Sequence, residues 1–323
     1  MRVFVCEFVT SGGLRGAALP ETLLPEGTAM RDAILADLAV LPGVRELMVA
    51  HDDRLAPPLA ASVPVAAGAD PWATWSALAA RADVIWPVAP ETGGLLAAMI
   101  RRLGRGGARL IASGLEAVEA CASKRETARR LAAAGLPHIP TFAAGAAPQD
   151  LLWPRVTKPD DGAGCENTRL WAEGARLPDA PGLIVQPFVA GTPASLSLLV
   201  RPDGPRLLSV NRQHLEVAED GAMSLKGLTV GGLADADGAL ARLAGKVAAA
   251  FPGLAGIVGI DVILAPAGPV VVEVNPRITT AYAGLHAALS VNPAAFLPEL
   301  IRAGTPPALP HLPPARPVEV LLR

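Results

Sequence analysis

The sequence predicts an α/β protein of three lobes, with an open parallel sheet at the N-terminus and α+β lobes after it. In the first third, strand-like runs alternate with Ala- and Leu-rich helical stretches, which is typical of parallel strands joined by crossover helices. Farther along, short apolar strands are bounded by glycine and proline, which favours an antiparallel or mixed sheet. The 323 residues also exceed the usual size of one hydrophobic core. We therefore expect lobes at 1–114, 115–190 and 191–323.

The first lobe is expected to begin with a buried strand and to end near Ser113. Residues 84–88 form a continuous apolar run, which suits a strand covered on both faces. The pattern as a whole predicts strands at 3–9, 46–50, 84–88 and 109–112, and helices at 27–40, 72–81 and 94–103.

A long helical pattern at 115–134 carries Lys124 in its middle and stops at Gly135, shortly before Pro137. The proline-rich tail at 305–317 is expected to be extended and to lie on the surface. Between these segments the pattern predicts strands at 155–158, 183–188, 195–200, 206–211, 257–264 and 269–274, and a helix at 236–250.

Composition favours a small-molecule substrate. The formal charge of -2 and the pI near 6.2 argue against nucleic acid or an anionic membrane as the main partner. No apolar run reaches the roughly 20 residues that a spanning helix needs. The three cysteines, Cys6, Cys121 and Cys165, are far apart and odd in number, so neither a disulfide framework nor a CxxC metal site is indicated. We expect a soluble cytoplasmic protein, for which a homodimer stays open.

The strongest chemical signal lies in the last pair of predicted strands, at 259–264 and 270–277. Because side chains on a strand repeat every second residue, Glu273 and Asn275 project from one face, and the hairpin partner can bring Asp261 beside them. Two carboxylates and an amide oxygen suit Mg²⁺ held between the protein and phosphates. The alternative is a pair of polar hairpin ends, but two acids buried among valines without a counter-ion would be unfavourable.

Three basic side chains and a glycine loop accompany these ligands. Arg277 shares their face if the chain stays extended, and its guanidinium could hold a phosphate oxygen through forked hydrogen bonds. Lys124 and Lys158 come earlier, and Lys158 ends an apolar strand, where a lysine needs an anion. Gly162 and Gly164 follow it in a loop whose backbone N–H groups could close over phosphates. Taken alone, such a loop is more typical of an ordinary hairpin, and it is its position among the other elements that favours a phosphate loop.

The apolar strand at 183–189 could present main-chain groups and the amide of Gln186 to an adenine edge. With this strand in place, the ordered set resembles the ATP-grasp superfamily over nearly the whole chain. The resemblance implies an ATP-grasp fold in which an N-terminal pre-ATP-grasp lobe, 1–114, binds substrate. A small lobe, 115–190, and a large lobe with the metal site, 191–323, would grip ATP between them.

The resemblance also implies a set of binding residues for ATP and Mg²⁺, for which Mn²⁺ can substitute: Lys124, Lys158, Gly162 and Gly164 for the phosphates, Gln186 and Val189 for adenine, and Asp261, Glu273 and Asn275 for one or two metal ions. Arg212 lies in a short string that recurs in relatives, so it either reaches phosphate or substrate or lies on the surface. The chain departs from many relatives by having Gln186 in place of Glu, and residues 192–194 leave the ribose ligand open.

Three short segments, 7–13, 89–92 and 275–285, are similar to the tyramine–glutamate ligase group of methanofuran and methylofuran biosynthesis. This similarity implies four substrate-binding side chains: Glu7, Glu91, Thr279 and Thr280. Glu7 and Glu91 follow strands of the first lobe, whose carboxyl ends are where such lobes bind ligands, and they would orient a cationic amine. For Glu91, a solvated acid that caps the next helix is the alternative.

These features predict an ADP-forming carboxylate–amine ligase that works through an acyl phosphate and joins glutamate to an aromatic amine such as tyramine. A carboxylate would attack the γ-phosphorus of ATP while Lys158 and the metal stabilise the charge on the transferring group. The amine would then displace phosphate, and Arg277 would steady the tetrahedral intermediate. The glycine loop after Lys158 would act as a lid that excludes water.

Three other functions stay open on the sequence alone. The first is an ATP-grasp ligase for another pair of amino acid and amine, and the second is a nucleotide-binding regulator without turnover. The third is a dinucleotide oxidoreductase, because Gly12, Gly13 and Gly16 follow the first strand. These glycines do not form the GxGxxG pattern, and no acidic residue is placed as that motif requires.

Overall fold

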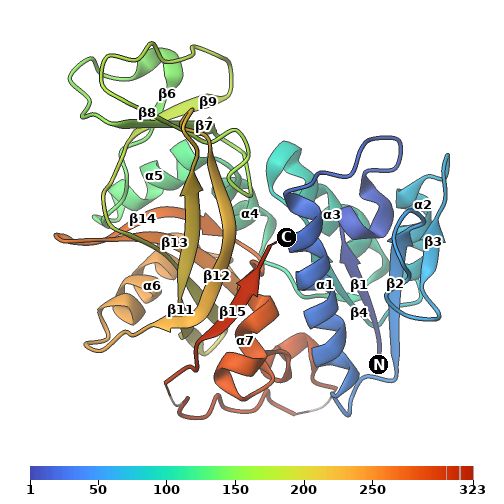
Figure 1. The fold of residues 1–323 in the computed structure, drawn as a ribbon. Helices are drawn as coiled ribbons and strands as arrows, with labels where there is room; N and C mark the ends of the chain where they lie inside the picture. Colours follow the sequence, from blue (N-terminus) through green and yellow to red (C-terminus); the bar gives the residue numbers. More distant parts are fainter. Residues whose placement is uncertain (303, 313, 323) are drawn as a thin grey trace.

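Three β-sheets organise the chain in the computed structural model, which describes residues 1–302, 304–312 and 314–322. They have five, six and four strands, and helices cover the larger two. The small sheet stands above the six-stranded sheet, and the N-terminal sheet lies beside both (Figure 1). The predicted fold class, α/β at the N-terminus with α+β lobes after it, is confirmed.

The N-terminal sheet is parallel throughout, and its strands stand in the order β3 (Val63–Val65), β2 (Glu46–Asp52), β1 (Arg2–Glu7), β4 (Val84–Val88) and β5 (Arg109–Leu110). Val3 and Val5 of β1 pack on one face against α1 (Leu23–Ala39). Phe4 and Cys6 pack on the other face, with α2 (Pro71–Ala79) and α3 (Leu95–Leu103). Every residue of β4 is buried, as expected for a strand covered on both faces.

The long helix predicted at 115–134 is wrong, because the chain breaks at Ser123. Ser123 has an extended conformation (φ -107°, ψ 121°) between α4 (Leu115–Ala122) and α5 (Lys124–Ala133). Its hydroxyl accepts a hydrogen bond from the Glu126 N–H at 3.1 Å, which is the usual cap of a new helix. The break puts Lys124 on the first turn of α5 rather than in the middle of a helix.

The small sheet is antiparallel and has the order β6 (Phe142–Ala143), β9 (Leu183–Pro187), β7 (Arg155–Pro159) and β8 (Arg169–Trp171). The large sheet is also antiparallel, in the order β14 (Gly268–Asn275), β13 (Gly256–Ala265), β10 (Thr192–Arg201), β11 (Gly204–Val217), β12 (Met223–Leu233) and β15 (Val318–Leu321). Two of its strands, β12 and β15, were not predicted. Gly227, Gly231 and Gly232 interrupt the apolar pattern of β12, and β15 is short.

Two helices cover opposite faces of the large sheet. α6 (Ala239–Ala250) packs on the face that contains Leu196 and Ile260. α7 (Tyr282–Leu289) packs on the other face and also against α1, so one hydrophobic core continues from the N-terminal sheet into the large lobe. Buried Asp37 of α1 fixes this joint, because it accepts a hydrogen bond from Tyr282 Oη at 2.7 Å and lies 2.6 Å from His286 Nδ1.

The tail at 305–317 has no regular secondary structure in its described part, in agreement with the predicted extended segment. It leads into β15, which pairs with β12. Among the described helices, none has both the length and the apolar composition needed to cross a membrane.

Candidate active site

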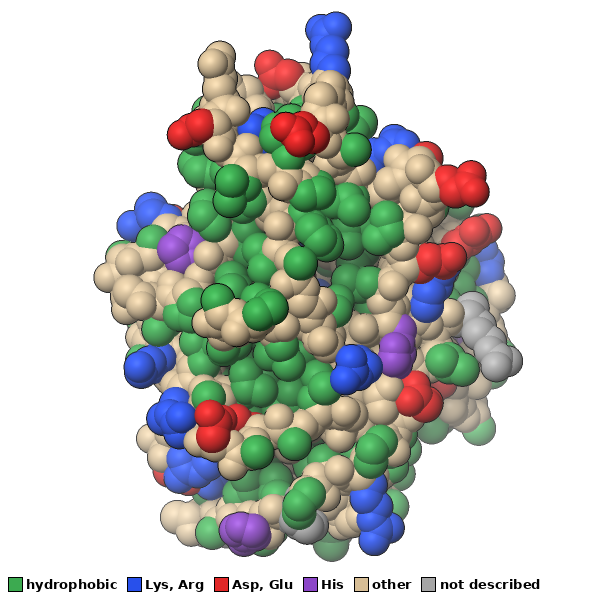
Figure 2. Space-filling view, turned by 60° about the vertical axis from the view of Figure 1, so that its left-hand side comes forward, with side chains coloured by type: hydrophobic (Ala, Val, Ile, Leu, Met, Phe, Trp, Pro, Cys, Tyr) green, Lys and Arg blue, Asp and Glu red, His purple; other side chains and the backbone are tan. Residues whose placement is uncertain are grey.

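A cleft of about 200 Å³ lies between the small sheet and the large sheet. Hydrophobic side chains gather around a hollow in the middle of the face shown in Figure 2. Most of the residues predicted to form a site line this cleft, although they come from distant parts of the chain: Lys124, Lys158, Gly162, Gly164, Gln186, Val189, Asp261, Glu273, Asn275, Arg277, Thr279 and Thr280. Glu7, Glu91 and Arg212 are not part of the lining.

The carboxylates in the cleft are neighbours on the β13–β14 hairpin. Asp261 pairs directly with Glu273, and Asn275 follows two residues later on the same strand. Asn275 Nδ2 donates a hydrogen bond to one carboxylate oxygen of Asp261 at 3.1 Å, and Gln213 Nε2 donates to the other at 3.0 Å. The three predicted ligand side chains therefore converge at one point, as two-residue alternation requires.

The electrostatics of this pair favour a cation. Burial raises the pKa of Asp261, and the neighbouring Glu273 raises it further. Burial acts in the same direction on Glu273, but Lys124 and Lys158 outweigh it and hold the pKa of Glu273 below its usual range. The described residues contain no group of three or more His, Cys, Asp or Glu side chains that could hold a metal. The site instead offers two carboxylates and one amide oxygen, and these hard oxygen donors fit Mg²⁺ when phosphates supply further oxygen ligands.

Both lysines come more than 100 residues before the carboxylates in sequence, yet they line the same cleft. Lys124 Nζ donates to the Gly162 carbonyl at 2.5 Å and lies 3.4 Å from Glu273 Oε2. Lys158 is buried, and burial lowers its pKa. Within the described part of the chain, no carboxylate lies within 4.0 Å of Lys158 Nζ. A buried ammonium without an ion-pair partner is suited to an anionic ligand such as a phosphate.

The glycine loop, residues 159–165, is held between α5 and the first lobe. Its Asp160 caps α5 by accepting hydrogen bonds from Ser123 Oγ at 2.8 Å and from the Arg125 N–H at 2.9 Å. Its Asp161 carbonyl accepts a hydrogen bond from Thr92 Oγ1 at 2.8 Å, which ties the loop to the first lobe. The loop also closes tightly on α1, because a β-carbon at Gly164 (φ +64°) would lie 2.8 Å from Leu23 Cδ2.

One end of the cleft is apolar and contains the strand predicted to read adenine. Buried Gln186 of β9 donates its Nε2 to Thr141 Oγ1 at 2.8 Å, which leaves its amide oxygen as a hydrogen-bond acceptor. Val189 lies beyond the end of this strand. The other side chains at this end are mostly apolar and include Ile139, Val156, Phe188, Ile263 and Val272. A flat heteroaromatic ring is the kind of ligand that such a slot accommodates.

Arg277 lies beside the predicted metal ligands and is fixed by an acid from the first lobe. Its Nη2 donates to Glu91 Oε2 at 2.9 Å, and its Nη1 donates to the Ile278 carbonyl at 3.1 Å. The sequence similarity implied that Glu91 contacts an amine. In the structure Glu91 forms an ion pair with Arg277 and does not line the cleft. The contact that Glu91 makes therefore orients the guanidinium of Arg277.

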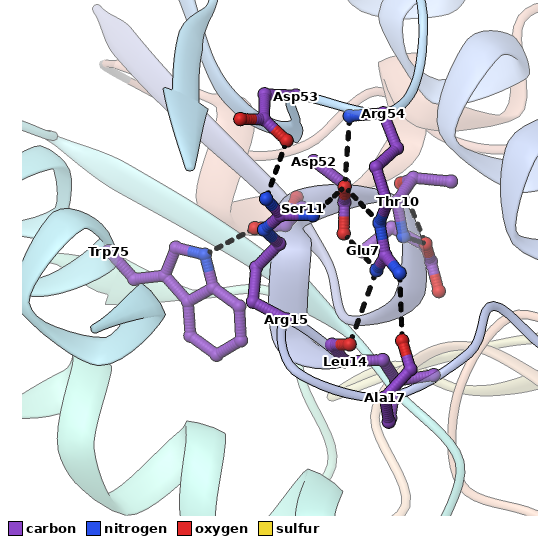
Figure 3. A network of polar contacts seen from close by, with 10 residues as sticks. All are labelled: Glu7, Thr10, Ser11, Leu14, Arg15, Ala17, Asp52, Asp53, Arg54 and Trp75. Atoms are coloured by element: carbon purple, nitrogen blue, oxygen red, sulfur yellow. Dashed lines mark hydrogen bonds and ion pairs between the residues drawn. The ribbon is translucent and has the colours of Figure 1, made fainter. Parts of the chain in front are cut away.

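Glu7 is deeply buried and belongs to a polar network in the first lobe (Figure 3). Its carboxylate accepts hydrogen bonds from the Val9 N–H at 3.2 Å and from Thr10 N and Oγ1, each at 2.7 Å. Asp52 holds the same region by pairing with Arg15 at 3.2 Å and with Arg54 at 2.7 Å. Glu7 lines a small cavity next to the cleft rather than the cleft itself.

Several residues that the sequence did not single out also line the cleft, among them Glu26, Ser195 and Gln213. For Arg212 the sequence left two alternatives, contact with phosphate or substrate and a position on the surface; its side chain is exposed and does not line the cleft. Its neighbour Gln213 contacts Asp261 instead, and strand alternation could have identified it. Glu26 lies on α1 in the first lobe and carries no motif that would have revealed it.

Comparisons with known proteins agree with this geometry. Residues 121–281 match the family described as ATP-grasp domain, and residues 45–118 match the family described as pre ATP-grasp 3 domain. A comparison with curated proteins gave no match.

Three solved structures from different organisms illustrate the similarity of fold. An ATP-grasp superfamily protein from Archaeoglobus fulgidus is 20% identical, with a TM-score of 0.74 over 92% of this chain and 87% of its own. The L-amino acid ligase from Bacillus licheniformis is 14% identical, with a TM-score of 0.63 over 92% and 73%. Carboxyaminoimidazole ribonucleotide synthase from Aspergillus clavatus, complexed with ATP, is 15% identical, with a TM-score of 0.60 over 90% and 77%.

The two family matches follow each other in the expected order and cover the lobes that enclose the cleft. The similar structures share the fold over most of the chain. The chain therefore belongs to the ATP-grasp superfamily, with a pre-ATP-grasp domain followed by an ATP-grasp domain.

Proposed function

We propose that this protein is an ADP-forming carboxylate–amine ligase that activates its acid substrate as an acyl phosphate. The observation that carries the proposal is the meeting of paired carboxylates, two buried lysines and a fixed arginine in one cleft between two lobes. Two of the similar structures are described as an L-amino acid ligase and as a synthase complexed with ATP, which is consistent with this reaction class.

In this proposal ATP lies along the cleft with adenine at the apolar end. Gln186 and the Val189 backbone read the base, while Lys124, Lys158 and the backbone of the glycine loop contact the phosphates. Asp261, Glu273 and Asn275 would hold Mg²⁺, or Mn²⁺ in its place, and the bound ion would offset charge on the phosphate oxygens.

The substrate carboxylate attacks the γ-phosphorus, and Lys158 stabilises the charge of the transferring phosphoryl group. The bond between the γ-phosphorus and the oxygen that bridges to the β-phosphate breaks. The carboxylate thereby becomes an acyl phosphate, and ADP is the leaving group. Arg277 stands where it can bind the carbonyl oxygen as the amine adds, since Glu91 holds its guanidinium in place. The glycine loop, which already contacts α1 and Thr92, excludes water from the acyl phosphate.

For the substrates, we propose an amino acid and an amine, with glutamate and an aromatic amine such as tyramine as the first pair to test. This choice rests on the similarity of residues 7–13, 89–92 and 275–285 to ligases of methanofuran and methylofuran synthesis. Thr279 and Thr280 line the cleft beside Arg277 and are proposed to contact the acid substrate. Another pair of amino acid and amine would leave the reaction class unchanged.

The test is ADP release from Mg-ATP in the presence of a matrix of amino acids and amines. ADP that forms only with glutamate plus an aromatic amine would support the full proposal, and ADP with a different pair would support the class alone. AMP as the product would contradict the acyl-phosphate route. Glu273→Gln should lower ADP release at least about 100-fold, whereas Glu216→Gln, at an exposed ion pair with Lys226, should leave it unchanged.

A further inference from the structure

Glu26 stands where three cavities meet. It lines the nucleotide cleft, a groove of about 440 Å³ between α1 and β12, and a chamber of about 40 Å³ beside Arg277. Gly164 of the glycine loop is the other residue common to all three linings. The loop therefore separates the nucleotide cleft from the groove, and Glu26 is accessible from both sides.

The carboxylate of Glu26 is held in place but has no cationic partner. Thr280 Oγ1 donates a hydrogen bond to Glu26 Oε2 at 2.5 Å, and a β-carbon at Gly164 would lie 3.4 Å from Glu26 Oε1. Within the described residues, no lysine or arginine forms an ion pair with Glu26. Burial raises the pKa of Glu26, while the hydrogen bond from Thr280 and the charge of Arg277 lower it by a smaller amount. Such a carboxylate is suited to pair with a positively charged ligand and to accept its proton.

The sizes of the two side cavities restrict how an amine can reach Glu26. The chamber has room for an ammonium group but not for a ring, and the buried carboxylate of Glu7 also borders it. The groove is about eleven times as large by volume (440 against 40 Å³) and combines acids with apolar side chains, namely Glu21, Glu166, Pro25, Met223 and Leu225. An amine can therefore extend along the groove with its ammonium group at Glu26.

Resting on the proposed ligase function, we infer that Glu26 is a catalytic residue that binds the ammonium group of the acceptor amine and takes its proton, and that the amine enters through the groove. The expected ligand is a primary amine whose remaining atoms lie in the groove, outside the nucleotide cleft. The acid and ATP occupy the cleft on the other side of the glycine loop, so the two substrates do not compete for one entrance.

Amide formation distributes the three hydrogens of the ammonium group in turn. The ammonium group gives one proton to the Glu26 carboxylate, and the neutral nitrogen forms a C–N bond with the acyl carbon. The bond between that carbon and the phosphate oxygen breaks, and the leaving phosphate takes the second proton from nitrogen. The amide keeps the third hydrogen, and Glu26 returns its proton to solvent through the groove.

The test separates amine use from acid activation in the Glu26→Gln variant. Mg-ATP and L-glutamate are supplied with either tyramine or hydroxylamine, or with the acid and amine that the substrate matrix identifies. Hydroxylamine is largely neutral at pH 7.5 and traps an acyl phosphate as a hydroxamate without needing a carboxylate to bind an ammonium group. Glu46→Gln, at an exposed ion pair with Arg81 that lines neither the cleft, the groove nor the chamber, is the matched control.

For Glu26→Gln we expect amide formation to fall at least about 100-fold, as for loss of a general base. Hydroxamate formation should stay within about threefold of wild type, and Glu46→Gln should keep both activities within the same range. An equal loss of amide and hydroxamate, or an amide rate that does not change, would overturn the assignment of Glu26. If the wild-type protein forms no hydroxamate with any acid, the ligase function itself is wrong, which is a different outcome from either of these.

Discussion

Removal of the acid that holds Arg277 should weaken both the fold and the reaction. Arg277 Nη2 and Glu91 Oε2 are 2.9 Å apart, and their side chains are only 13% and 8% exposed. Glu91→Ala leaves a buried guanidinium without its counter-charge, which lowers the free energy of unfolding by about 3–5 kcal/mol. Glu91→Gln keeps an oxygen that can accept the hydrogen bond but loses the charge. A charged hydrogen bond contributes about 1 kcal/mol more than a neutral one, so the loss should be about 1–2 kcal/mol.

Urea unfolding followed by circular dichroism measures both losses. Glu116→Gln is the control, because Glu116 is 79% exposed and lies 3.6 Å from Arg130, so its ion pair should contribute less than about 1 kcal/mol. In folded Glu91→Gln, ADP release should fall at least about tenfold because a neutral amide holds the guanidinium less firmly than the carboxylate does. If Glu91→Ala unfolds within about 0.5 kcal/mol of wild type, the buried Glu91–Arg277 pair does not stabilise the fold as proposed.

Three further predictions concern other charged groups. Lys158→Met removes a buried ammonium that has no ion-pair partner among the described residues, so the free energy of unfolding without nucleotide should stay level or rise. ADP release should nevertheless fall at least about 100-fold. A strong loss of stability in this variant would contradict the prediction. Asp37→Ala removes the acceptor for Tyr282 and His286 between α1 and α7, and should lower the free energy of unfolding by about 2–4 kcal/mol, clearly more than Tyr282→Phe in the same urea titration. Hydrogen bonds from Arg129 and Arg130 lower the pKa of Glu126 to about 2 from its usual 4.5, so this group stabilises the fold above pH 4.5 and loses that contribution as the pH falls to about 2. Glu126→Gln should therefore unfold with a weaker dependence on pH over that interval, and an unchanged dependence would show that Glu126 is not responsible.

The parts of the fold that follow from local pattern were predicted well. The buried run at 84–88 and the alternation at 259–275 each fix a strand and the direction of its side chains, so the neighbouring positions of Asp261, Glu273 and Asn275 could be foreseen. The resemblance then added the order of the lysines and the glycine loop. These residues could be identified from the sequence alone, without information on tertiary contacts.

One error could have been avoided from local sequence. Ser123 sits in a good helical pattern, but its cap on Glu126, three residues later, is a local signal for the break, and Asp160 adds a second hydrogen bond to the Ser123 hydroxyl. The other errors arose where distant segments meet. Glu91 and Arg277 are 186 residues apart, and their ion pair depends on how the first lobe packs against the large lobe. Glu26 reaches the cleft for the same reason, since the core shared by α1 and α7 brings it to Thr280. No short-range pattern contains this information.

The proposed function depends above all on Asp261 and Glu273 binding Mg²⁺ together with the triphosphate of ATP in the cleft. Calorimetric titration with a non-hydrolysable ATP analogue, with and without Mg²⁺, measures this binding. We expect tight binding by the wild-type protein only with Mg²⁺, and a loss of that Mg²⁺ dependence in Glu273→Gln, while Glu216→Gln binds as wild type does. Equal affinity of wild type and Glu273→Gln for the Mg²⁺ complex would show that Glu273 does not hold the metal.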